Sequence, residues 1–145
     1  MDFFDALKIS ASGLAAQRTR LSVLSSNLAN ANSTRSADGS GPYKRRDPIF
    51  QEVKMGSFDN HLDKASKKIS AVSVRDIVTD NTPGPRVYDP SHPDADKDGY
   101  VSMPNVNLVT ELSDIMATSR AYEANVTAMQ SAKQMVNAVL QIGKG

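Results

Sequence analysis

Proline placement limits the fold of this 145-residue chain more than any other feature. All seven prolines lie between Pro42 and Pro104. Proline lacks the backbone donor that a helix needs and clashes with the preceding turn, so long helices are expected only outside this region. The chain is therefore predicted to be mainly α, with an N-terminal helix within 1–33, a β-rich or irregular central segment at 34–104, and a C-terminal helix within 105–145.

Apolar residues before the proline region recur at alternating steps of four and three. A repeat averaging 3.5 residues keeps one seam facing a partner helix, which is typical of a coiled coil. Poor helix formers from Asn30 to Thr34 mark the end of this helix. The seam leucines are Leu7, Leu14, Leu21, Leu24 and Leu28.

The segment after the proline region carries a similar stripe. Asn107 is predicted to cap a helix of about 107–141 that stops at Gly143, with Glu111 near the positive end of the helix dipole. Val109, Met116, Met135 and Val139 add apolar surface beside the stripe. The stripe itself includes Leu112, Ile115, Tyr122, Val126, Met129, Val136 and Leu140.

These two helices are long for a small globular core, since a helix of ~30 residues is ~45 Å long. They are predicted to pair as a coiled coil, but a two-helix bundle leaves apolar flanks uncovered. Neighbouring subunits would cover those flanks, so the seam residues named above are predicted to form an assembly interface. A self-contained helical hairpin is the alternative.

Short β-type runs occupy the middle of the chain. Residues 49–53 and 69–78 are rich in Ile and Val, and the second run partly alternates between apolar and polar. Arg86-Val87-Tyr88 is a candidate short extended segment between turn-forming residues. We expect a small twisted hairpin that projects from the helical pair.

Composition excludes several classes of function. The 17 Lys and Arg nearly cancel the 16 Asp and Glu, which offers no global attraction for nucleic acid or an anionic membrane. The local cluster Lys44-Arg45-Arg46 is interpreted as a solvated loop. There is no cysteine, no apolar run long enough to span a bilayer, and no basic segment typical of a secretory signal peptide.

No pattern of residues points to catalysis. The two histidines, His61 and His92, are far apart and lack a ligand at helical spacing. Glu111, Asp114 and Glu123 are interpreted as a solvated helix face. The chain has no nucleophile elbow and no phosphate-binding glycine loop. We therefore expect no enzyme activity, no catalytic or cofactor-binding residues and no cofactor.

An acidic turn resembles the start of a calcium loop. Asp94, Asp96, Asp98 and Gly99 fit positions 1, 3, 5 and 6 of an EF-hand. Position 12, which must be a bidentate glutamate, is Asn105. The proline-rich stretch before the turn also replaces the helix that an EF-hand requires. No metal site is expected, and a calcium-binding interaction module remains the alternative function.

Two motifs carry a resemblance to the bacterial flagellar basal-body rod proteins. Residues 11–34, ASGLAAQRTRLSVLSSNLANANST, resemble the N-terminal signature of rod and hook proteins, with Ser33 where the family usually has Thr. Residues 87–107 and 41–51 are similar to proximal rod proteins of the FlgC type, and 56–68 match least. The signature residues are Ser12, Gly13, Leu14, Asn27, Ala29, Asn30, Asn32, Tyr88, Asp89, Pro90, Gly99, Tyr100, Pro104 and Asn105.

The resemblance implies a structural subunit of the proximal rod, in the periplasmic part of the flagellar basal body. Such subunits self-assemble with other rod proteins into a helical tube that transmits motor torque to hook and filament. Implied partners are other proximal rod subunits, the distal rod protein, the rod-to-membrane-ring adaptor and the flagellar type III export apparatus. The chain would be homo-oligomeric within a hetero-assembly and exported without a cleaved signal peptide. A coiled-coil adaptor unrelated to flagella is a further alternative.

Overall fold

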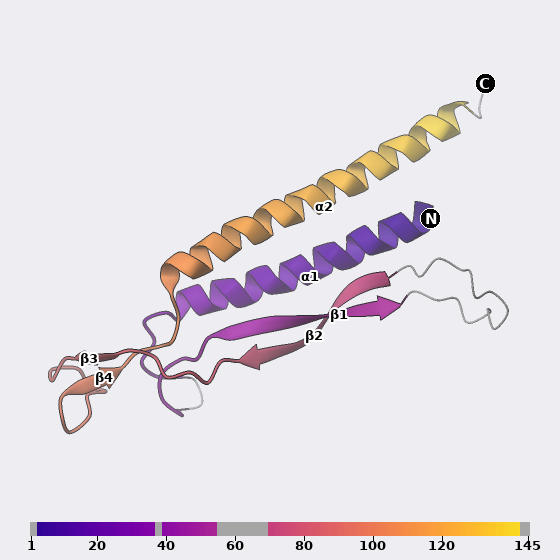
Figure 1. The fold of residues 1–145 in the computed structure, drawn as a ribbon. Helices are drawn as coiled ribbons and strands as arrows, with labels where there is room; N and C mark the ends of the chain where they lie inside the picture. The colour runs from indigo at the N-terminus through magenta and orange to yellow at the C-terminus, as the bar shows by residue number, and fades with distance from the viewer. Residues whose placement is uncertain (1–2, 37–38, 55–69, 143–145) are drawn as a thin grey trace.

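Two long helices and a small central β region make up the structure (Figure 1). The computed structural model describes residues 3–36, 39–54 and 70–142. Helix α1, Phe3–Ala29, and helix α2, Leu108–Ile142, lie side by side and antiparallel, so α1 begins near the end at which α2 finishes. The prediction of long helices on both sides of the proline region is confirmed, whereas their supercoiling as a coiled coil stays a prediction.

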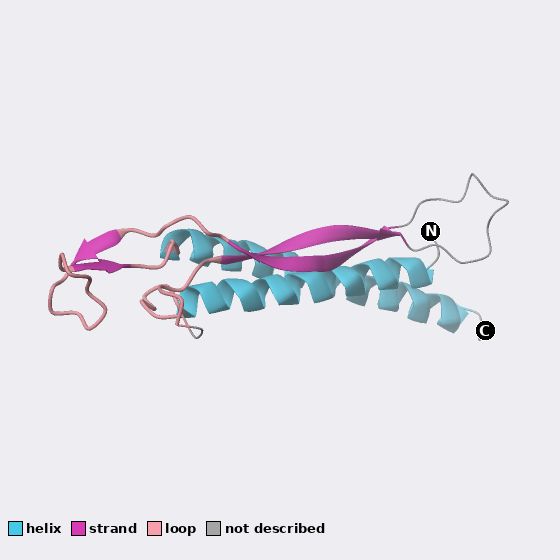
Figure 2. Cartoon of the chain, turned by 90° about the horizontal axis from the view of Figure 1, so that it is seen from below, coloured by secondary structure: helices cyan, strands magenta, loops and turns pink. Residues whose placement is uncertain are grey.

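A two-stranded antiparallel hairpin forms most of the central region. Strand β1, Arg46–Lys54, pairs with strand β2, Ser70–Thr79, and the register shifts between Ile49 and Phe50. The hairpin lies along α1, on the side opposite α2, and twists strongly along its length (Figures 1 and 2). The expected hairpin is confirmed, but the expectation that it projects from the helices is wrong. An isolated hairpin is only marginally stable, and packing along α1 supplies the apolar surface that it lacks.

A second, smaller ribbon lies beyond the base of the helices, where α1 ends and α2 begins (Figure 1). Strand β3, Arg86–Tyr88, pairs with strand β4, Tyr100–Ser102. The extended segment expected at Arg86–Tyr88 is confirmed. Strand β4 was not predicted, because its three residues follow an acidic turn without any alternating pattern.

Side-chain amides define the helix ends at the base. Asn107 caps α2 as predicted, because its Oδ1 accepts hydrogen bonds from the backbone amides of Val109 and Thr110 at 3.0 and 3.2 Å. At the end of α1, Asn30 donates from Nδ2 to the Ser26 carbonyl at 2.9 Å. The predicted stop at Gly143 and the weakly matching stretch 56–68 lie outside the described residues.

Helix α1 is the middle layer of the molecule. It packs against α2 on one side and the hairpin on the other (Figure 1). The buried apolar residues of the described part are Ala16, Val23, Leu24, Ala31, Tyr43, Ala71 and Val101, and most of them belong to α1 or follow it closely. Helix α2 is covered on one side only. Over the described residues, neither helix is long and apolar enough to cross a membrane.

Candidate functional site

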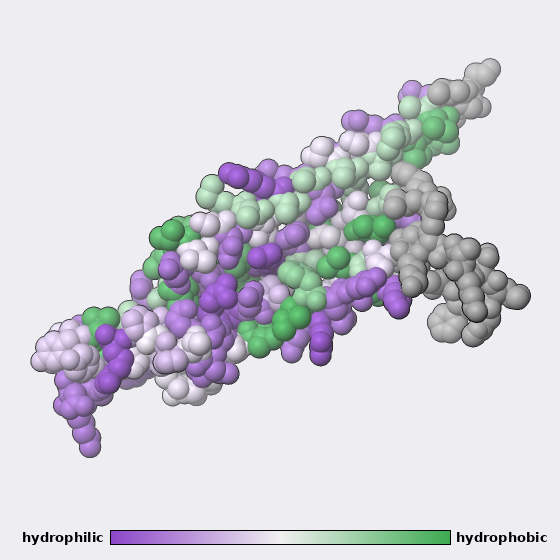
Figure 3. Space-filling view, viewed as in Figure 1, coloured by the Kyte–Doolittle hydropathy of each residue, from purple (hydrophilic) through white to green (hydrophobic). Residues whose placement is uncertain are grey.

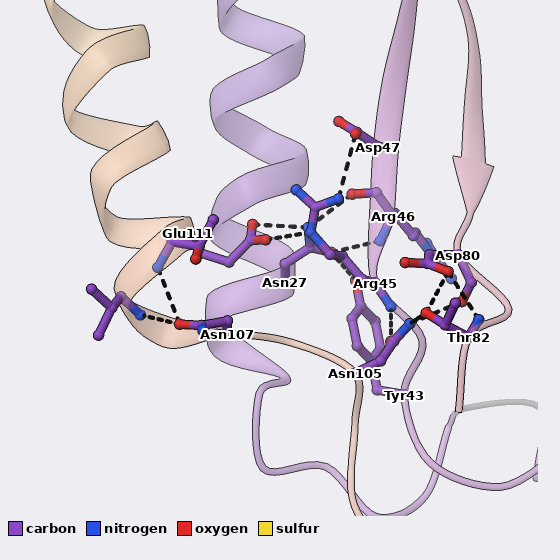
Figure 4. A network of polar contacts seen from close by, with 12 residues as sticks. Asn27, Tyr43, Arg45, Arg46, Asp47, Asp80, Thr82, Asn105, Asn107 and Glu111 are labelled. Atoms are coloured by element: carbon purple, nitrogen blue, oxygen red, sulfur yellow. Dashed lines mark hydrogen bonds and ion pairs between the residues drawn. The ribbon is translucent and has the colours of Figure 1, made fainter. Parts of the chain in front are cut away.

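Asn27 is the centre of a polar junction at the base of the helices (Figure 4). Its side chain is fully buried, near the end of α1. The Oδ1 atom accepts hydrogen bonds from the Arg46 amide at 3.0 Å and the Tyr43 hydroxyl at 2.9 Å. The Nδ2 group donates to the Arg46 carbonyl at 2.8 Å and to Glu111 Oε2 at 3.0 Å. These four bonds use both donors and both acceptor positions of the amide, and they join α1, β1 and α2.

Glu111 supplies the charged part of this junction. It lies in the first turn of α2 and is 0% exposed. Its Oε1 accepts a hydrogen bond from Arg45 Nε at 2.6 Å. That bond raises the pKa of the Arg45 guanidinium above its ordinary value, so Arg45 remains a cation. A buried carboxylate needs such a charged partner, together with the Asn27 amide, to offset the loss of water.

Two predictions about charged residues are therefore wrong in part. Glu111 was expected on a solvated helix face with Asp114 and Glu123, but only Glu123 is exposed and Asp114 is half-buried. Arg45 was expected in a solvated loop, yet it forms the ion pair with Glu111. The two partners are 66 residues apart in the sequence. The spacing of the acidic residues within α2 therefore does not indicate the contact between Glu111 and Arg45.

Asn105 fastens the chain just before α2. Its Oδ1 accepts a hydrogen bond from the Arg45 amide at 2.8 Å. Its Nδ2 donates to the Asp80 carbonyl at 3.2 Å and the Thr82 hydroxyl at 3.1 Å. The segment entering α2 is thus tied to the segments flanking both hairpin strands. At this position, where a calcium loop requires a glutamate, the asparagine performs a structural role.

Ser12 and Gly13 are adjacent signature residues that contact different neighbours of α1. The Ser12 hydroxyl donates to the Ile9 carbonyl at 2.7 Å and accepts from the Val72 amide of β2 at 3.2 Å. A Cβ atom at Gly13 would lie 3.3 Å from Asn125 Nδ2 of α2. The serine therefore holds the hairpin, and the glycine allows close approach of α2.

Asp94, in the acidic turn, binds the loop that follows α1. Its Oδ2 accepts a hydrogen bond from the Thr34 hydroxyl at 2.7 Å, and its Oδ1 accepts one from Arg35 Nε at 2.5 Å. The Thr34 bond is the main cause, and Arg35 a further one, of a lowered pKa for the Asp94 carboxyl. Both oxygens that would bind calcium already have partners in the protein.

Asp96 closes the turn on itself. Its Oδ1 accepts hydrogen bonds from the backbone amides of Asp98 and Tyr100, both at 2.9 Å, and its Oδ2 pairs with Arg86. The Tyr100 amide is the main cause of the lowered pKa of this carboxyl. Among the described residues, no three histidine, aspartate or glutamate side chains converge to hold a metal ion.

Gly99 completes the turn. Its φ of +80° is unfavourable for other residues, and a Cβ atom there would lie 2.9 Å from Tyr88 Cε2. The Tyr88 and Tyr100 rings pack edge to face, with their centroids 5.2 Å apart, and the Arg86 guanidinium lies over the Tyr100 ring. The acidic turn is therefore a packed structural element in which signature residues contact one another.

The structure distributes the predicted interface residues over three environments. Leu24 is 1% exposed and is part of the subunit's own core. Leu112 and Leu140 are exposed. The others are half-buried: Leu7, Leu14, Leu21, Leu28, Ile115, Tyr122, Val126, Met129 and Val136. Their role in assembly stays a prediction. Val109 and Met116, which the sequence placed beside the stripe, are more exposed than Leu112.

Comparison with known proteins identifies the class to which this fold and its signature belong. Residues 7–35 match the family model described as "Flagella basal body rod protein". Residues 97–142 match the model "Flagellar basal body rod FlgEFG protein C-terminal". These two regions contain most of α1 and all of α2, together with Asn27, Asn105 and Glu111 of the polar junction.

Relatives that are similar over their whole length indicate which type of rod protein this chain resembles. Proteins named "Flagellar basal-body rod protein FlgC" are 42% identical in Bacillus subtilis and 41% identical in Borreliella burgdorferi. The alignments cover 99% and 100% of this chain, and 100% of each relative. The Salmonella typhimurium protein of that name is 37% identical over 99% of this chain and 100% of its own length. The chain therefore belongs to the flagellar basal-body rod family, and within it to the FlgC type.

Proposed function

We propose that this chain is a non-enzymatic structural subunit of the proximal rod of a bacterial flagellum. Segments 1–33 and 105–145 form its assembly domain. Copies of the chain join other rod proteins in a helical tube that transmits torque from motor to hook and filament. Its partners are the other rod subunits, the ring adaptor and the type III export apparatus that delivers it without signal cleavage. The names and full-length similarity of the relatives support this proposal.

The outer surface of α2 is the structural observation that carries the proposal. Val109, Leu112 and Met116 are 74%, 48% and 57% exposed on the side that α1 does not cover, and Leu108 lies beside them. We call these four residues the base strip. Figure 3 shows weakly hydrophobic surface continuing along α2. Such a surface is unusual on a helix in water and is suited to burial by neighbouring subunits.

The distribution of charge along α2 supports the same conclusion. Its 35 residues include five charged ones, of which Glu111 is buried within the subunit. Lys133 alone is charged between 124 and 142. Burial of apolar area contributes about 25 cal/mol per Å² before ordering costs are subtracted. Few ions would have to be desolvated when other subunits cover this helix, so most of that contribution remains.

A pair of charge substitutions tests the proposal in the source bacterium. Leu112→Asp places a carboxylate in the base strip and should abolish hooks and motility. Thr110→Asp introduces the same charge at an exposed position two residues away, where the helix N-terminus tolerates an acid, and should leave motility normal. Normal motility of the Leu112→Asp strain, with the protein at its usual level, would overturn the assembly role of α2.

A further inference from the structure

Side chains at the start of the hairpin divide between two faces. The Arg45 guanidinium lies 2.6 Å from Glu111 Oε1 and 3.4 Å from Asp47 Oδ2, so the cation on this face is paired with carboxylates (Figure 4). Lys44 and Arg46 belong to the opposite face, because successive side chains of an extended chain alternate in direction. Alternation therefore brings two cations together, apart from the ion pairs of the junction.

Lys44 and Arg46 line one cavity of about 260 Å³ beside the loop that follows α1. Each cation is held by a neutral neighbour. Lys44 Nζ donates a hydrogen bond to Asn81 Oδ1 at 2.9 Å, and the Arg46 guanidinium lies over the Tyr43 ring, 5.8 Å from its centroid. Thr79, the cross-strand partner of Arg46, also lines the cavity. The positions of the two cations are therefore set by the hairpin and by Tyr43.

These two cations have no counter-ion in the described part of the chain. No described carboxylate forms an ion pair with either side chain. The described lining of the cavity contains no Asp or Glu, and both cations are exposed to solvent. Two like charges in one cavity repel each other, and an anion between them would remove that repulsion. The cavity therefore favours a negatively charged group from outside the subunit.

The backbone around the cavity indicates which anion fits. The amides of Ser36 and Tyr43 already donate to carbonyl groups of the same loop, and the Arg46 amide donates to Asn27. Phosphate sites typically use several free backbone amides, which these residues do not offer. A planar guanidinium with an ammonium beside it instead suits a carboxylate. The volume is also below the roughly 300–1,000 Å³ of small-molecule sites and suits a single side chain.

We propose that this cavity binds the carboxylate of an Asp or Glu side chain from a neighbouring protein in the rod. Arg46 forms hydrogen bonds to both carboxylate oxygens, and Lys44 adds a second positive charge. The contact belongs to the hairpin and is separate from the seam of the terminal helices. Exposed ion pairs add little affinity but select the partner and its orientation. The inference rests on the proposed function, because the rod supplies the neighbour.

Carbodiimide coupling tests this contact in basal bodies isolated from the source bacterium. The reagent forms an amide, without a spacer, between an amine and a carboxylate that touch each other. Mass spectrometry of the digested product should find Lys44 joined to an Asp or Glu of another chain. Lys54, an exposed lysine at the far end of β1, is the matched control. Inter-chain coupling should be about tenfold greater at Lys44, because docking raises the effective concentration of the carboxylate.

A substitution at the same position checks the identity of the product. Lys44→Arg keeps the positive charge but has no amine that carbodiimide couples, so the product should disappear. Inter-chain coupling at Lys44 that is absent, or no greater than at Lys54, would overturn the carboxylate site. A site for phosphate, whether free or on a lipid, would give that negative result, because it holds no carboxylate of another chain.

The amount of the chain in the same basal bodies separates this inference from the proposed function. An immunoblot that finds the chain, without inter-chain coupling at Lys44, would refute the carboxylate site and leave the rod role intact. Absence of the chain from basal bodies would refute the proposed function, and the inference with it.

Discussion

The base of the molecule and the helical shafts above it are held together by different physical means. At the base, buried Asn27 and Glu111 make directional hydrogen bonds to partners from three segments of the chain. Along the shafts, most seam residues are half-buried and apolar. Hydrogen bonds at the base specify one arrangement, whereas apolar contacts are non-directional. The base thus defines the shape of the subunit, and the shafts leave surface that other subunits can complete.

The largest expected effect comes from removing the central amide of the base. Asn27→Ala removes both side-chain hydrogen bonds to the Arg46 backbone, and it takes one hydrogen-bond partner each from the Tyr43 hydroxyl and the buried Glu111 carboxylate. We expect the free energy of unfolding to fall by about 4 kcal/mol, since each unsatisfied buried group costs about 1–3 kcal/mol. Urea denaturation of the purified chain measures it.

Asn30→Ala is the matched control for that experiment. The Asn30 side chain makes two local hydrogen bonds, to the Ser26 carbonyl and from the Ser33 hydroxyl. Its loss should cost about 1 kcal/mol. Equal losses from the two alanine variants would contradict the view that the junction dominates the base.

A somewhat smaller effect is expected from the apolar core. Leu24→Ala should lower the free energy of unfolding by about 3 kcal/mol, because the fully buried leucine leaves a cavity. Leu112→Ala, on the exposed side of α2, should change it by less than about 0.5 kcal/mol. Thermal and urea denaturation of both variants tests the difference. A large loss for Leu112→Ala would mean that its exposed surface already has a role inside the subunit.

The acidic turn offers a milder test of packing at the base. Gly99→Ala combines an unfavourable positive φ with a clash against Tyr88 and should cost about 2 kcal/mol. Gly39 has a similar φ of +73°, but its Cβ atom would meet nothing within 4 Å. Gly39→Ala should therefore cost about 1 kcal/mol. If the two variants unfold at the same urea concentration, the Tyr88 contact contributes nothing.

Lowering the pH should have the smallest effect on stability, and this effect should be confined to the acidic turn. Hydrogen bonds lower the pKa values of Asp94 and Asp96. Their stabilisation is therefore complete above the ordinary aspartate pKa of about 3.9 and is lost as pH falls through the lower folded values. Below about pH 4, the Asp98 and Tyr100 amides should lose protection from hydrogen exchange. The Val109 and Thr110 amides, capped by the non-titrating Asn107, are the internal control; equal loss at both places would refute a local effect.

Much of the fold could be predicted because its signals are local. Proline excludes helix wherever it occurs, and a heptad repeat extends over several turns, so both helices, and Asn107 as the cap of α2, were expected from the sequence. The hairpin strands were expected from their β-branched residues. The position of the hairpin along α1 depends on contacts such as Ser12 with Val72, which are 60 residues apart. No pattern within either segment records such a pairing.

The junction shows the same limit at the level of single residues. The family resemblance singled out Asn27 and Asn105 without indicating what they bind. Glu111 has the spacing of an ordinary solvated acid, and only its distant partner, Arg45, explains its burial. For the seam leucines, a 3.5-residue repeat predicts a partner helix but does not distinguish a partner in the same chain from one in a neighbour.

The two attachments of the hairpin have a mechanical consequence. Asn27 fastens it through β1 and Ser12 through β2, at points about 22 Å apart along α1. A twisted hairpin that is joined to a helix at two separated points opposes rotation of that helix about its own axis, and it also opposes sliding along the helix. Two separated attachments therefore fix both the position of the hairpin along α1 and its orientation about the helix axis.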